Sequence, residues 1–218
     1  MARETKYDLR GASFDQFVSF IFRSSIKGEH GKKFWYWEAG VAFEPHEIAT
    51  HYIRLFTEPQ FLLERFVEPT LEAGFWAIQS VNLDCGVPHI MWTEELPFAV
   101  RQTCVRSMFH LFERLFALEP LDTASNMWWD SLCYDWHCGN RFRTNGGEDL
   151  RMQDVIFETL NRILRLDSVP CQTAALHGLG HLHHPDTERV IEQYLQGNPM
   201  VSPKLRDYAL AAAKFDIQ

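Results

Sequence analysis

Apolar residues recur every three or four positions over most of the chain, which is the spacing that places them on one face of an α-helix. The first such stripe comprises Phe14, Phe17, Val18 and Ile21. Ser13 and Gln16 have the spacing of a capping box at its start. A second stripe follows Pro45, a residue suited to the first turn of a helix, and comprises Ile48, Tyr52, Ile53 and Phe56. Strict alternation of apolar and polar residues is hard to find, so the pattern predicts an all-α protein.

The longest helical stripe begins near Pro97 and ends at Glu119 and Pro120. Its apolar members are Val100, Cys104, Val105, Met108, Phe109, Phe112, Leu115 and Phe116. Further helices are predicted over residues 125–137 and 152–166. The segment between them contains CGNRFRTNGGED, whose glycines and polar residues predict a turn-rich loop.

The segment FWYWEAGVAF, residues 34–43, fits a buried strand and a buried helix equally well. The polar stretch before it, residues 24–33, is expected to be a loop, so the structure of residues 24–44 stays open. Composition does not change sharply anywhere along the chain. We therefore expect one helical-repeat domain over residues 1–218, with irregular helices in residues 1–120 and the clearest repeats in residues 150–218.

Helix-start signals recur near the C-terminus, where a capping residue or a proline stands before each apolar stripe. These signals are Ser168-Val169-Pro170, Pro185-Asp186 and Ser202-Pro203. Ala175 and Leu176 recur as Ala209 and Leu210, an offset of 34 positions that lies near the period of helical-pair solenoids.

The segment VPCQTAALHGLGHLHHPDTERVIEQYL resembles a HEAT-like repeat of the bacterial type, in which AA-x-x-LG-x-L-x-x-P-x-x-x-x-x-I-x-x-x-L describes two antiparallel helices. The pattern positions are held by Ala174, Ala175, Leu179, Gly180, Leu182, Pro185, Ile191 and Leu195. The resemblance covers residues 169–215. It implies that the all-α fold is a HEAT-like α-α superhelix built from antiparallel helix pairs.

Small residues in this repeat allow neighbouring helices to approach closely, while leucines and an isoleucine fill the seam between them. The small residues are Ala174, Ala175, Gly178 and Gly180. The histidines take the positions that remain. We expect His177, His181 and His184, at spacings of four and three, to face outward together at the rim.

The charge of the chain indicates which partners it can bind, and its cysteine content indicates the redox environment in which it folds. The chain has 21 basic and 29 acidic side chains and a formal net charge of -8, which disfavours nonspecific binding to a phosphate backbone. No apolar run has the length of a membrane span and the N-terminus lacks a signal-peptide core, so we expect a cytoplasmic protein. Five cysteines at irregular spacings predict reduced thiols.

The strongest chemical signal is HGLGHLHH, in which His177 and His181 have the i, i+4 spacing that lets two imidazoles bind one zinc ion. The segment lacks the glutamate of a zincin motif. Cys133 and His137 of CYDWHC would supply further ligands if the two regions meet. We expect no cofactor, and we keep a zinc site of His177, His181, Cys133 and His137 as the alternative.

A second cluster of candidate residues lies in MWWDSLCYDWH, residues 127–137, which includes Trp128. Helical spacing sets Trp129, Cys133 and Trp136 on one side and leaves Asp130, Tyr134 and His137 near another, where a carboxylate and an imidazole share a groove. HEAT-like alkylpurine DNA glycosylases hold a damaged nucleotide in a groove of aromatic residues and an aspartate. They rely on a basic concave face, which the charge balance of this chain argues against.

These observations favour a non-enzymatic scaffold or adaptor that binds a protein partner through a helical-repeat surface. An acidic binder suits a basic partner, which it would mask; neither nucleic acid nor membrane is expected. The binding surface is expected to include Trp128, Trp129, Asp130, Tyr134, His137, His177, His181 and His184. No catalytic residue is assigned. The alternatives are a zinc-dependent enzyme and a HEAT-like DNA glycosylase.

Overall fold

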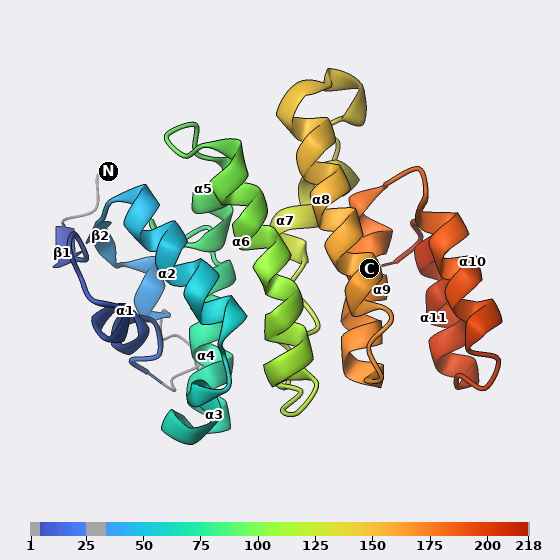
Figure 1. Ribbon diagram of the computed structural model, residues 1–218, viewed down its shortest axis with the longest axis horizontal. Helices are drawn as coiled ribbons and strands as arrows, with labels where there is room; N and C mark the ends of the chain where they lie inside the picture. Colours follow the sequence, from blue (N-terminus) through green and yellow to red (C-terminus); the bar gives the residue numbers. More distant parts are fainter. Residues whose placement is uncertain (1–4, 25–33, 218) are drawn as a thin grey trace.

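The computed structural model describes residues 5–24 and 34–217, and this part of the chain is predominantly helical (Figure 1). Its helices are α1 (Phe14–Ile21), α2 (Pro45–Thr57), α3 (Phe61–Arg65), α4 (Glu68–Gln79), α5 (Val87–Trp92), α6 (Phe98–Leu111), α7 (Asp130–His137), α8 (Gly147–Ile163), α9 (Val169–Leu182), α10 (Thr187–Gly197) and α11 (Pro203–Ala213). A π-helical stretch, Phe112–Phe116, extends α6. No helix in the described ranges is long and apolar enough to cross a membrane.

The helices follow one another along the long axis of the molecule, from the blue N-terminal end to the red C-terminal end (Figure 1). One set of neighbours is formed by α2, α6 and α8, with α6 packed between the other two. A second set is formed by α7, α9 and α11, with α9 packed in the middle. The sets are joined where α8 packs on α9 and where α5 packs on both α6 and α7. Helix α9 is therefore surrounded by α7, α8 and α11.

The N-terminal end carries a small parallel sheet, in which β1 (Thr5–Asp8) pairs with β2 (Gly40–Ala42). The ambiguous segment at residues 34–43 thus contains both kinds of structure, because a 3-10 helix (Trp35–Trp37) precedes β2. The prediction of an all-α chain was wrong at this point. Residues 25–33, which we expected to form most of a loop, lie outside the described residues.

Helix α7 is shorter than the sequence predicted, because it begins at Asp130 and not at Ser125. The two tryptophans before it, Trp128 and Trp129, are at most 1% exposed and pack in the core. Aromatic neighbours surround Trp128, including Phe56 and Phe75. The buried apolar side chains form one cluster that reaches from Leu9 to Ile217.

The helix-start signals of the C-terminal part are confirmed. Helices α9, α10 and α11 begin directly after Ser168, Asp186 and Ser202, and the Ser202 side chain accepts a hydrogen bond from the backbone of Leu205. Residues 34 positions apart share the same burial only in part. Ala175 and Ala209 are both fully buried, whereas Leu176 is buried and Leu210 is 45% exposed.

Candidate functional site

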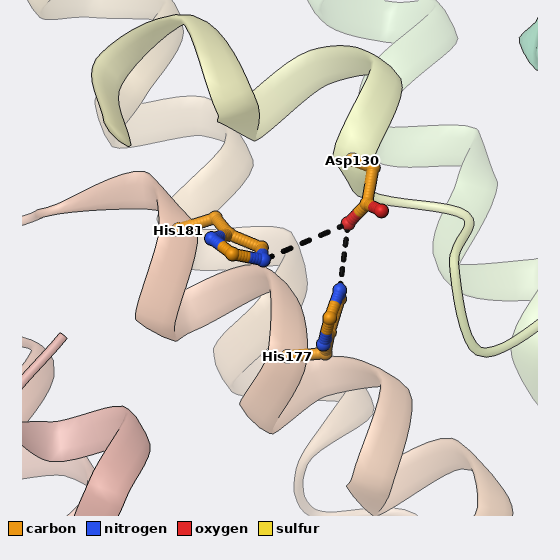
Figure 2. Close-up of side chains that lie close together, drawn as sticks. All are labelled: Asp130, His177 and His181. Atoms are coloured by element: carbon orange, nitrogen blue, oxygen red, sulfur yellow. Dashed lines mark hydrogen bonds and ion pairs between the residues drawn. The ribbon is translucent and has the colours of Figure 1, made fainter. Parts of the chain in front are cut away.

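A carboxylate and two imidazoles meet where the first residue of α7 faces the middle of α9 (Figure 2). His177 and His181 lie one turn apart on α9, so both side chains point to the same side of the helix. Asp130 Oδ1 lies 2.7 Å from His177 Nε2 and 3.9 Å from His181 Nε2. The packing of α7 against α9 therefore brings together residues 47 positions apart in the chain.

His177 is held at both ring nitrogens. Its Nε2 bonds to Asp130, and its Nδ1 lies 2.7 Å from the hydroxyl of Tyr208 on α11. An ionised carboxylate only accepts hydrogen bonds, so in the neutral ring Nε2–H donates to Asp130 and Nδ1 accepts from the Tyr208 hydroxyl. Three helices thus fix the orientation of one imidazole.

His181 is as buried as His177, at 2% exposed, but its polar atoms are poorly satisfied. Its buried Nδ1 has no hydrogen-bond partner among the described residues, and the 3.9 Å from Nε2 to Asp130 is too long for a hydrogen bond. Its ring contacts those of Tyr134, His137 and His177 edge to face. Burial lowers the pKa of His181 to about 4, and nearby His177 acts in the same direction, so the ring is neutral at pH 7.

Asp130, His177 and His181 are the group of described residues whose donor atoms lie close enough to hold one metal ion, within 4.8 Å of one another. The zinc alternative combined His177 and His181 with Cys133 and His137, whereas the structure brings the two histidines together with Asp130. Cys133 is fully buried and does not belong to this group, and burial raises the pKa of its thiol well above the usual value. His137 contacts the ring of His181 but directs Nδ1 toward His183 Nε2, at 3.3 Å.

A cavity of about 870 Å³ lies beside this cluster, between the N-terminal part of the fold and α7. Its aromatic lining consists of Phe34, Tyr36, Trp37, Trp76 and Tyr134. Asp130 belongs to the lining, and none of the lining residues that the structure describes is lysine or arginine. A second cavity, of about 580 Å³, is lined by His177 and Tyr208 on the side of α11. The cluster therefore lies between two cavities.

The expectation that the histidines face outward at the rim was wrong. His177, His181 and His184 are 2%, 2% and 4% exposed. For His177 and His181 the reason is that α9 lies between α7, α8 and α11, which leaves this helix little free surface. His184 lies apart from the other two, where its Nε2 bonds to Asp154 and its ring stacks on Phe157.

The residues that we expected to form one binding surface differ in their exposure to solvent. Trp128 and Trp129 are core residues, whereas Tyr134 is 47% exposed and Asp130 and His137 are partly buried. The predicted separation of Trp129, Cys133 and Trp136 from Asp130, Tyr134 and His137 is confirmed, since the first three are buried. Asp130 does contact an imidazole, but this ring is His177 of α9 and not His137, and the two residues line different cavities.

Residues of the site that the sequence pattern missed are Tyr208 and the aromatic residues that line the cavity, such as Trp37 and Trp76. Tyr208 lies 31 positions from His177, and no motif links the two. The sequence matches no protein family, no curated protein and no solved structure in the comparisons made with it. The resemblance of residues 169–215 to bacterial-type HEAT repeats gains no support from these comparisons.

Proposed function

We propose that this chain is a non-enzymatic scaffold of HEAT-like architecture that binds a partner protein in the aromatic cavity beside α7. Two features of the helical arrangement support the architecture. Helix α6 packs on α8, α7 packs on α9 and α9 packs on α11, so alternate helices are neighbours in this part of the fold, while α8 with α9 and α10 with α11 are neighbours in chain order. Gly178 and Gly180 lie where a Cβ atom would clash with neighbouring elements, as expected for helices stacked through small residues.

The observation that carries the binding function is the cavity and its exposed apolar rim. Three of its lining residues are large and well exposed: Trp37 at 41%, Val81 at 65% and Tyr134 at 47%. Contiguous apolar surface of this kind marks sites of protein interaction, and aromatic pockets accept the anchor side chains that dominate binding energy. The expected occupant is therefore one bulky apolar side chain of the partner.

The negative charge of the chain favours basic residues next to that anchor in the partner. The chain has a net charge of -8, the cavity lining contains Asp130, and the described lining residues include no base. A partner segment with lysine or arginine next to its apolar anchor would be attracted by this field. A cavity with this lining does not favour the glycosylase alternative, which needs basic side chains for the phosphate backbone.

Selection from a library of random peptides displayed on phage tests this function. On the wild-type protein we expect enriched peptides to share a bulky apolar residue flanked by basic residues. Val81→Asp places a charge at the cavity rim and should weaken their binding by roughly tenfold or more. Val67→Asp is the matched control, because Val67 is 68% exposed and lies at the other end of α4.

Two results would contradict the proposal. One is enrichment of peptides with no shared anchor or with acidic flanks. The other is an equal loss of binding in Val81→Asp and Val67→Asp, which would show that surface charge acts without the cavity. The affinity of the enriched peptides should also fall with added salt, since the basic flanks act through screened charge.

A further inference from the structure

We infer that Asp130, His177 and His181 form a binding site for one divalent transition-metal ion of the zinc class. Each residue offers one donor atom, and the three atoms lie within 4.8 Å of one another at the contact of α7 with α9 (Figure 2). Two imidazoles with one carboxylate suit zinc and its neighbours in the transition series, whereas magnesium and calcium prefer all-oxygen sites.

The distances fit an ion that would settle between the three groups. Ligand atoms about 2.0–2.1 Å from a tetrahedral zinc ion are roughly 3.3 Å apart. The two distances from Asp130 Oδ1, 2.7 Å to His177 and 3.9 Å to His181, lie on either side of that value. The three donor atoms lie within 4.8 Å of one another, so the side chains would have to rotate for the wider pairs to close on one ion. Three protein donors leave a fourth tetrahedral position for water or for a ligand.

The second observation is the state of His181. Buried imidazoles ordinarily bond at one nitrogen or more, but Nδ1 of His181 is buried without a partner among the described residues. Its Nε2 points at the carboxylate of Asp130 from beyond hydrogen-bonding distance (Figure 2). Hydrogen bonding within the fold thus does not explain why a histidine stands here. A metal ion between Nε2 and Oδ1 would bind the lone pair of Nε2, and Nδ1 would then carry the ring proton, still without a partner among the described residues.

Tyr208 is a positioning residue for this site. Without metal, Nε2 of neutral His177 carries the ring proton and Nδ1 accepts from the Tyr208 hydroxyl. If Nε2 bound the ion, the ring proton would be carried on Nδ1 after exchange with solvent, and Nδ1–H would donate a hydrogen bond to the Tyr208 oxygen. A hydroxyl can take both roles, and such a partner on the far nitrogen orients metal-binding histidines.

Titration of EDTA-treated full-length protein with zinc chloride, followed by calorimetry and metal analysis, tests the site. We expect one bound ion per chain. His181→Phe keeps the ring and its aromatic contacts while removing the donor nitrogen, and it should weaken zinc binding about 100-fold or more. Asp130→Asn keeps the shape and should act likewise. Tyr208→Phe should weaken binding about tenfold while the protein remains folded by circular dichroism.

His110→Ala is the matched control for adventitious binding, because His110 pairs with the carboxylate of Glu113 at the surface, at 3.0 Å. It should leave zinc binding unchanged. Absence of a bound ion in the wild type, or equal binding by wild type and His181→Phe, would overturn the inference. The site shares Asp130 with the lining of the peptide cavity, but Val81 lies outside the metal-binding group, so Val81→Asp should retain zinc and the two experiments can fail separately.

Discussion

At the scale of single residues, His184 shows how the fold satisfies a buried imidazole by hydrogen bonds alone. Its Nδ1 accepts a bond from the backbone N–H of Asp186, at 3.1 Å, and its Nε2 lies 3.0 Å from Asp154. Because Nδ1 is an acceptor, the ring is neutral with its proton on Nε2. Burial lowers the pKa of His184, and the Asp154 carboxylate opposes this only in part.

This pKa shift predicts a pH-dependent contribution to stability. The unfolded state takes up the proton first as the pH falls below about 6.5, so the stabilisation by neutral His184 is complete above that pH and is lost as the pH falls toward the lowered pKa. In His184→Gln the unfolding free energy at pH 7 should be about 1–2 kcal/mol lower. It should also depend less on pH between 7 and 5 than in the wild type. Urea unfolding at each pH measures both. Parallel pH profiles of the two proteins would contradict the assignment.

The histidines also show what residue-level patterns can predict. The i, i+4 spacing correctly predicts that His177 and His181 share one face of α9. It does not reveal which neighbour that face meets, since Asp130 and Tyr208 are 47 and 31 positions away. Histidine has no fixed preference for core or surface, so the pattern left burial undecided. The side of the helix was predictable and the environment was not.

At the scale of elements, the contacts of α9 depend on a residue without a side chain. A Cβ atom at Gly178 would lie 2.7 Å from Leu160 Cδ2 on α8 and 2.8 Å from Trp129 Cβ before α7. The first neighbour can rotate, but the second is tied to the backbone. Gly178→Ala should therefore destabilise the protein by about 1–3 kcal/mol, although alanine is the better helix former. Thermal or urea unfolding measures the change.

Gly197 in α10 provides the comparison for that substitution. A Cβ atom there would meet nothing within 4 Å, and the residue lies in a helix. Gly197→Ala should thus be neutral or stabilising by up to about 1 kcal/mol. If both substitutions destabilise equally, close packing at Gly178 is not the cause.

Element prediction succeeded where signals are local and failed where pairing is remote. Prolines and capping residues marked the starts of α2, α9 and α11, because these groups act on the backbone next to them. Strand β1 has four residues and pairs with β2 more than 30 positions later, so no local pattern announces it. Helix α7 starts later than the pattern indicated, and the buried residues Trp128 and Trp129 precede it.

At the scale of the whole molecule, the arrangement of helices along one axis predicts a gradient of local stability. Helix α6 packs between α2 and α8 in the middle, whereas α10 packs mainly on α11 at the C-terminal end (Figure 1). In stacked helical arrays each element is stabilised by its neighbours, so an end helix opens at lower free energy than a central one. Amides of α10 should exchange with deuterium at least about tenfold faster than those of α6, equivalent to about 1.4 kcal/mol. Mass spectrometry of peptides from the native protein measures both rates. Equal protection of the two helices would indicate a single cooperative unit and would count against the proposed stack of helix pairs.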